Sequence, residues 1–177
     1  MKHIEQMSKR LAFLLRHDIE AFEEGKIDEN GWRRVDELLN QGFTMDILNE
    51  IVKTNNKKRY EFNTDLTMIR ARQGHSINVN VGLEKRAPLK YLYHGTSETV
   101  KDSILKDGIK SMNRLYVHLS ADIETAINVG KRHGGKVIVF RIDAEKMDAE
   151  GCEFYLSRNN VWLTEFVDSK YIQLIKE

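Results

Sequence analysis

Three short basic clusters carry the residues best suited to bind a phosphate group. They are Arg16-His17, the segment Arg70-Ala71-Arg72-Gln73-Gly74-His75-Ser76, and Lys131-Arg132-His133-Gly134. A guanidinium group can donate two parallel hydrogen bonds to a phosphate, and a neighbouring histidine can exchange a proton near neutral pH. Arginines at helix C-termini also stabilise the helix dipole without any ligand. The repetition of the pattern, twice with an adjacent glycine, favours an anion site over that purely structural interpretation.

A second pair of motifs combines a histidine with a hydroxyl two residues later. The motifs are His94-Gly95-Thr96 and His118-Leu119-Ser120, and each follows a short apolar segment that we predict to be a strand. One such motif usually contains only a buried histidine, whereas two at equivalent strand ends indicate a site. The pair is compatible with nucleotide binding, and equally with acid–base catalysis by both histidines in a metal-free phosphoesterase.

The sequence contains no spacing typical of a metal site or of a common nucleotide-binding loop. Cys152 is the single cysteine, and no H-E-x-x-H or C-x-x-C pair accompanies the six histidines. We therefore expect no metal, no internal disulfide and a reducing compartment, with the cytoplasm as the default. G-x-G-x-x-G and G-K-[ST] are also absent. Any nucleotide is then expected to bind to something other than a Rossmann fold or a P-loop.

Composition is typical of a globular protein of one large domain or two small lobes. The chain has 177 residues, is 41% hydrophobic and carries a formal net charge of +1. No apolar run approaches the roughly 20 residues that cross a bilayer, and the start lacks the apolar region of a secretory signal. Because neither half has a strong excess of charge, nucleic acid would bind only at a locally assembled basic site. We expect a monomer.

Pro88, the only proline, lies in a polar stretch that divides the chain into residues 1–87 and 88–177. The first part predicts helices over 7–15, 35–39 and 45–52, with Ser8 capping the first helix and Thr44 the third. A hairpin of strands 60–62 and 66–69 follows. This order is typical of a winged-helix-like lobe. The second part predicts helices capped by Ser97 and Asp122 among strands at 91–93, 115–117, 137–142, 153–156, 161–167 and 171–175. The fold class is therefore α+β.

Several short motifs occur in a fixed order along both parts. The first part contains Ser8-Lys9, Leu14-Leu15-Arg16-His17, Gly31-Trp32, Val35-Asp36, Leu38-Leu39, Ile69-Arg70-Ala71 and Gln73-Gly74-His75-Ser76. The second contains Tyr93-His94-Gly95-Thr96, Val117-His118-Leu119-Ser120, Gly130-Lys131-Arg132-His133-Gly134 and Asn160-Val161-Trp162-Leu163-Thr164. Together they resemble the RNA (tRNA) 2′-phosphotransferase family over nearly the whole chain.

The resemblance implies a winged-helix RNA-binding lobe packed on an ADP-ribosyltransferase-like lobe that binds NAD. The implied catalytic residues are Arg16, His17, Arg70 and Arg132. The implied NAD-binding residues are His94, Gly95, Thr96, His118, Ser120 and Val161, and the implied RNA-binding residues are Lys9, Gln73 and His75. Arg72 competes with Arg70 for the phosphate-contacting role.

The implied reaction removes an internal 2′-phosphate of the kind left at tRNA splice junctions, without a metal. The RNA 2′-phosphate attacks the ribose of NAD, and nicotinamide leaves. A ribose hydroxyl then attacks the phosphorus, which yields RNA with a 2′-hydroxyl and ADP-ribose 1″,2″-cyclic phosphate. Because the nucleophile is already an anion, the apolar Val161 can occupy a position where protein-modifying relatives use a carboxylate.

Two other functions remain as alternatives at this level. A metal-free RNA phosphoesterase would use His94 and His118 but leaves Arg16-His17 without a role. A non-catalytic winged-helix protein that binds nucleic acid would leave the second lobe without a role.

Overall fold

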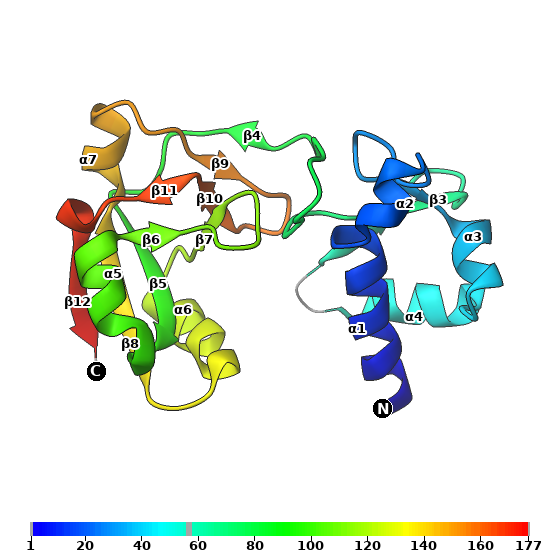
Figure 1. Cartoon of the computed structure of the whole chain (residues 1–177), viewed down its shortest axis with the longest axis horizontal. Coiled ribbons are helices and arrows are strands. Elements are labelled where there is room, and N and C mark those ends of the chain that lie inside the picture. Colours follow the sequence, from blue (N-terminus) through cyan, green and yellow to red (C-terminus); the bar gives the residue numbers. More distant parts are fainter. Residues whose placement is uncertain (1, 56–57, 177) are drawn as a thin grey trace. The chain divides into compact units, whose positions relative to one another are not determined.

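The computed structural model describes residues 2–55 and 58–176. It divides into two compact units, Met1–Gly82 and Leu83–Glu177 (Figure 1). The predicted division lay five residues later, after residue 87. The structure differs because strand β4 (Glu84–Lys85) pairs with strand β9 (Tyr155–Leu156) and so belongs to the second unit. None of the helices in the described ranges combines the length and apolar character that crossing a bilayer requires.

Helices and a small antiparallel sheet form the described part of the first unit. The helices are α1 (Lys2–Arg16), α2 (Ile19–Glu23), α3 (Val35–Asn40) and α4 (Met45–Thr54). The strands β1 (Arg33–Arg34), β2 (Tyr60–Phe62) and β3 (Met68–Ala71) lie in the order β1-β3-β2. The predicted cap of α4 is confirmed, because Thr44 Oγ1 accepts a hydrogen bond of 3.2 Å from the Ile47 N–H.

One expectation for the first unit was wrong in detail, and one helix was not predicted. Helix α1 begins at Lys2 and not near Ser8, because the apolar stripe continues back through Ile4, which packs against the core. Helix α2 was not predicted, since its five residues are too few for a clear period. Asp18 Oδ1 caps it by accepting a hydrogen bond of 3.2 Å from the Ala21 N–H.

The core of the first unit packs α1, α3 and α4 against β2 and β3. Its buried members are Met7, Leu11, Leu14, Leu15, Val35, Leu38, Phe43, Leu48, Ile51, Tyr60, Ile69 and Ala71. Arg33 is also buried, and its guanidinium donates to the Leu14 carbonyl (2.9 Å) and to Asp18 Oδ2 (2.7 Å). A buried cation needs such partners. This arginine therefore ties β1 to the end of α1.

Short helices and three antiparallel sheets form the described part of the second unit. The helices are η1 (Glu98–Val100), α5 (Lys101–Asp107), α6 (Ile123–Gly130), η2 (Lys131–His133), α7 (Ala144–Ala149) and η3 (Ser169–Tyr171). The remaining strands are β5 (Tyr91–Ser97), β6 (Ile109–Lys110), β7 (Val117–Leu119), β8 (Val137–Asp143), β10 (Trp162–Thr164), β11 (Phe166–Val167) and β12 (Ile172–Lys176). The sheet orders are β4-β9-β10-β7, β11-β6 and β12-β8-β5.

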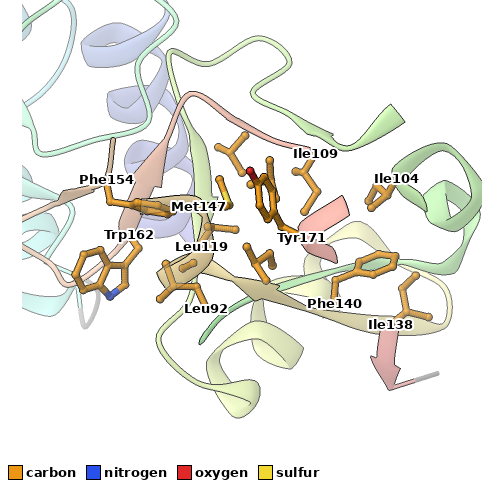
Figure 2. Packing of buried hydrophobic residues seen from close by; sticks show 14 residues of the cluster. Leu92, Ile104, Ile109, Leu119, Ile138, Phe140, Met147, Phe154, Trp162 and Tyr171 are labelled. Atoms are coloured by element: carbon orange, nitrogen blue, oxygen red, sulfur yellow. The ribbon is translucent and has the colours of Figure 1, made fainter. Parts of the chain in front are cut away.

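One apolar core joins these sheets (Figure 2). Figure 2 shows Leu92 of β5 and Phe140 of β8 in it with Leu119 of β7 and Trp162 of β10. The predicted caps in this unit are confirmed: Asp122 Oδ1 accepts from the Thr125 N–H (2.7 Å), and Ser97 Oγ accepts from the Thr99 N–H (3.4 Å). The whole chain thus combines helices with small antiparallel sheets, as the predicted α+β class requires.

Candidate functional site

The end of helix α1 carries the first pair of predicted catalytic residues. Arg16 is the last residue of α1, and the N–H of His17 still donates to the Phe13 carbonyl (2.9 Å). The segment after β3 returns to this helix end, where the Ser76 N–H donates to the Arg16 carbonyl (2.9 Å) and Ser76 Oγ lies 3.0 Å from His17 Nδ1. Residues about 60 positions apart are thereby held side by side.

Arg70 lies within strand β3 and its side chain is held by three neighbours. Its Nε donates to Glu61 Oε1 (2.8 Å), its NH1 group donates to the Asn30 carbonyl (3.0 Å), and its guanidinium carbon lies 4.3 Å from the centroid of a Trp32 ring. Such contacts remove rotamer freedom before a ligand binds. Arg70 is therefore a preorganised cation and not a mobile surface arginine.

Arg72 shares the same carboxylate. Its Nε lies 3.1 Å from Glu61 Oε2, and its side chain is 21% exposed, against 8% for Arg70. Residues i and i+2 of a strand point to the same face, so both arginines reach one acidic neighbour. Sequence pattern could not separate them for that reason.

His75 joins the cationic groups of this cluster as a neutral, buried ring. Its side chain is 2% exposed, and its pKa is lowered to about 3, first by burial and then by the charges of Arg16, His17 and Arg70. The charges of three of the four predicted catalytic residues therefore act on this one ring in the first unit. His75 Nε2 has no hydrogen-bond partner among the described residues.

The other two predicted RNA-binding residues differ in their setting. Gln73 is half-buried in the segment after β3. Lys9 lies on an exposed part of α1, where its Nζ is 2.9 Å from Glu5 Oε1.

The buried His75 predicts acid sensitivity of the first unit. Its pKa is lower in the folded chain than the ordinary value near 6.5, so the unfolded chain binds a proton that the folded chain excludes. The free energy of unfolding therefore falls as the pH drops from 6.5 towards 3, by about 1.4 kcal/mol for each pH unit. Between pH 7 and pH 5 the loss from this ring is about 2 kcal/mol.

Urea unfolding at pH 7 and pH 5 measures this loss of stability. Trp32 fluorescence is the reporter, in a Trp162→Phe background. The two tryptophans lie in different units, so this background reports on the first unit alone. His75→Gln should lose about 2 kcal/mol less than the parent on acidification, and the exposed His3→Gln should behave like the parent. An equal pH response in the parent and in His75→Gln would contradict the assignment.

In the second unit, strand pairing gathers the predicted NAD-binding residues. Tyr93 and Ser120 exchange backbone hydrogen bonds of 2.9 and 2.8 Å, which joins β5 to the end of β7. His118 of β7 pairs with Leu163 of β10, and β10 begins directly after Val161. His94, His118, Ser120 and Val161 therefore come from three neighbouring segments of one unit.

His94 and Thr96 do not end a strand as predicted, because β5 continues through both to Ser97 and pairs with β8 over its full length. The prediction for β7 was also wrong, since this strand runs over Val117–Leu119 and includes His118. Gly95 allows helix α6 to approach β5 closely. A Cβ added at Gly95 would lie 1.7 Å from the carbonyl oxygen of Ala126, so helix α6 crosses the strand at backbone distance.

Hydrogen bonds assign different tautomers to the two histidines. His94 Nδ1 lies 3.3 Å from the His118 carbonyl, which can only accept, so the His94 proton is on Nδ1. His118 Nδ1 lies 3.2 Å from the NH1 group of Arg114, which can only donate, so a neutral His118 carries its proton on Nε2. Burial lowers the pKa of His94, with a smaller opposing effect of the His118 carbonyl. His94 is therefore a neutral ring.

Arg132 belongs to the second unit. It lies in η2, directly after α6, and is exposed there. η2 contacts β5 within the same unit. The fourth predicted catalytic residue thus sits near the predicted NAD-binding strand. Across residues 2–55 and 58–176, no group of three or more histidine, cysteine or acidic side chains could hold a metal ion.

Sequence patterns missed the roles of three residues that shape these clusters. Glu61 and Trp32 hold Arg70, and Arg114 sets the tautomer of His118. The hairpin contained a signal for the first, because the antiparallel register places Glu61 directly opposite Arg70. Trp32 was recognised only as part of the Gly31-Trp32 motif, without its contact to Arg70, and no motif marked Arg114.

Residues 2–166 match the model of the RNA 2′-phosphotransferase, Tpt1/KptA family. The chain belongs to this family. A probable RNA 2′-phosphotransferase of Fusobacterium nucleatum is 49% identical over 174 residues, which covers 95% of this chain and 97% of that protein. Two further probable RNA 2′-phosphotransferases are similar, one from Flavobacterium johnsoniae (47% over 173 residues, 94% of each chain) and one from Hahella chejuensis (44% over 181 residues, 98% of this chain and 96% of that protein). The resemblance stated from the motifs is confirmed.

Proposed function

We propose that this chain is an RNA 2′-phosphotransferase that uses NAD as co-substrate and removes an internal 2′-phosphate from RNA. The observation that carries the proposal is the preorganised cluster of Arg16, His17 and Arg70 in a member of the Tpt1/KptA family. The relatives named above are called probable RNA 2′-phosphotransferases, which supports the transfer of a 2′-phosphate. Two guanidinium groups beside a histidine suit a phosphate dianion and a proton transfer.

The second unit fits NAD as the partner substrate. His94 and His118 offer fixed and different donor and acceptor atoms on adjacent strands, which suits recognition of a ligand with defined polar groups. The proposed NAD-binding set is His94, Gly95, Thr96, His118, Ser120 and Val161. Bound NAD supplies an electrophilic ribose carbon. The half-buried apolar Val161 is consistent with a nucleophile that needs no carboxylate to activate it.

The residues of the first unit act on the phosphate in two proposed steps. In the first, Arg16 and Arg70 orient the RNA 2′-phosphate while one of its oxygens bonds to the ribose carbon and nicotinamide departs. In the second, the ribose 2″-hydroxyl bonds to phosphorus and the bond from phosphorus to the RNA 2′-oxygen breaks. His17 exchanges a proton with the attacking hydroxyl or the departing oxygen. Arg132 of the second unit stays a proposed catalytic residue.

The burial and the hydrogen bond of His94 argue against the phosphoesterase alternative. An acid–base pair needs both rings to gain and lose protons near neutral pH. Burial disfavours the charged form of His94, and its Nδ1 already donates to a backbone carbonyl. A ligand-positioning role fits this ring better than a catalytic one.

The proposed function predicts strict dependence on NAD. An oligonucleotide with one internal 2′-phosphate should lose it in the presence of NAD and excess chelator, with one nicotinamide released for each phosphate removed. Without NAD the substrate should stay intact, and His17→Ala should not complete the reaction. Loss of phosphate without NAD, as inorganic phosphate, would support the phosphoesterase. RNA binding without phosphate loss would support a binding protein.

A further inference from the structure

Ser76 stands between the side chain of His17 and the backbone of Arg16. Its Oγ lies 3.0 Å from His17 Nδ1 and 3.3 Å from the Arg16 carbonyl oxygen. The Ser76 N–H donates independently to that same carbonyl at 2.9 Å. The hydroxyl is thus held at the end of α1 by a backbone bond that does not depend on its own side chain.

A count of protons decides the direction of these bonds. The serine hydroxyl has one proton, and a backbone carbonyl can only accept. If the hydroxyl donated to His17 Nδ1, its oxygen would face the Arg16 carbonyl oxygen at 3.3 Å with no proton between two acceptors. If His17 Nδ1–H donates to the hydroxyl, the hydroxyl proton is available for the carbonyl, and both contacts are hydrogen bonds. In the second arrangement both contacts of the Ser76 hydroxyl are hydrogen bonds.

We infer that Ser76 is a positioning residue that holds the proton of His17 on Nδ1, so that Nε2 is the nitrogen that exchanges protons with the substrate. The role of Nε2 in proton exchange rests on the proposed function, whereas the position of the proton on Nδ1 does not. The same chain of bonds serves the neutral and the doubly protonated ring, because Nδ1 donates in both. His17 can therefore gain and lose a proton at Nε2 without turning its ring.

A hydroxyl suits this position better than a carboxylate. The serine orients the ring as an acidic partner would, but it adds no negative charge beside a site built for a phosphate. Arg16 and Arg70 lie close enough to His75 to lower its pKa, so their charges are concentrated around this segment. A carboxylate in place of Ser76 would offset part of that positive charge.

Nitrogen-15 NMR of the imidazole rings tests the tautomer without any substrate, with His17→Ala used to assign the His17 signals. Above the titration of the ring, we expect wild-type His17 to carry its proton on Nδ1. Ser76→Ala should shift His17 towards the Nε2–H form, and Ser76→Thr, which keeps the hydroxyl, should restore the wild-type pattern. A wild-type ring protonated on Nε2, or a pattern unchanged in Ser76→Ala, overturns the inference.

Single-turnover kinetics test the consequence for the reaction. Ser76→Ala should slow the second step about tenfold or more and leave the first step within about twofold, because only the second step needs the proton at Nε2. Ser76→Thr should recover most of the lost rate. Asn78→Ala, an exposed change in the same segment, should match wild type. Equal slowing of both steps, or no recovery with threonine, indicates a merely structural role and overturns the inference.

The two measurements separate the possible failures. A wild-type chain with the Nδ1–H tautomer but no NAD-dependent dephosphorylation would refute the proposed function and leave the hydrogen-bond chain standing. Dephosphorylation by a chain whose His17 carries the proton on Nε2 would refute the inference alone. Melting temperatures of the serine variants should stay near that of wild type, since the bond from the Ser76 N–H to the Arg16 carbonyl remains.

Discussion

Replacing Arg70 with alanine should slow the second step by roughly 10²–10³-fold and leave the first step much closer to wild type. In the proposed first step the phosphate is already an anion, so Arg70 would only orient it. In the proposed second step, negative charge would build on the phosphate oxygens as the RNA 2′-oxygen departs. Only contacts that strengthen in the transition state lower a barrier. RNA that carries ADP-ribose on its 2′-phosphate should therefore accumulate.

A time course on end-labelled RNA measures the intermediate directly. Arg72→Ala is the matched control, because it removes the same kind of side chain from the same strand face and the same Glu61 neighbour. It should slow the second step far less. If Arg72→Ala accumulates the intermediate and Arg70→Ala does not, the phosphate site has been assigned to the wrong arginine.

Because Glu61 is buried beside Arg70, a second variant is needed to separate a loss of stability from a loss of phosphate contact. Arg70→Ala removes one cation from a carboxylate that is 10% exposed, and a buried charge that loses its partner destabilises a fold. Arg70→Ala combined with Glu61→Gln removes the charge of both. The second-step defect should persist in the double variant, with its melting temperature nearer to that of wild type. Recovery of the second step in the double variant would show that stability, and not phosphate contact, explains the single variant.

Replacing Gly95 with alanine should unfold or severely destabilise the second unit. The added Cβ would lie 1.7 Å from the Ala126 carbonyl oxygen and 2.4 Å from its carbonyl carbon. Both atoms are backbone, so no side-chain rotation relieves the clash, and α6 must move away from β5. Displacing a packed helix from a strand falls among the exceptional single changes of about 4 kcal/mol or more. For a unit of this size that is a fall in Tm of roughly 15–30 °C.

Thermal unfolding followed by Trp162 fluorescence in a Trp32→Phe background checks the change in the second unit. Asn128→Ala, an exposed substitution on the same helix, is the control and should leave Tm within a few degrees of the parent. Adding Ala126→Gly to Gly95→Ala should not restore stability, because the obstructing atoms remain. A Gly95→Ala protein that melts like the parent would contradict the close approach of α6 to β5.

Local sequence signals predicted much of the secondary structure. Thr44, Ser97 and Asp122 cap helices as expected, because a hydroxyl or carboxylate oxygen accepts the first N–H groups of a helix wherever the helix packs. The hairpin was also predicted, with its first strand at the observed bounds and its second strand displaced by two residues. The boundary before β4 was misplaced by five residues, because a two-residue strand has no period of its own.

In the candidate site, the contacts of the side chains depend on residues that are distant in the sequence. Motif order alone predicted the family, which the family model confirms, and it also predicted functional roles for Arg16, His17 and Arg70. Tertiary structure decided that Arg70 is held by Glu61 and Trp32, since those contacts join residues that no local spacing relates.

The sequence by itself determined the family, most of the elements and the residue types of the site, because caps, turns and motifs depend on neighbours along the chain. Only the tertiary structure decided the roles that depend on packing. Gly95 is needed because a helix crosses the strand, and not because a strand ends there. Ser76 meets His17 only because the segment after β3 returns to the end of α1. A hydrogen-bond chain between residues 59 positions apart has no signature in local sequence, because its geometry exists only after the fold has brought both segments together.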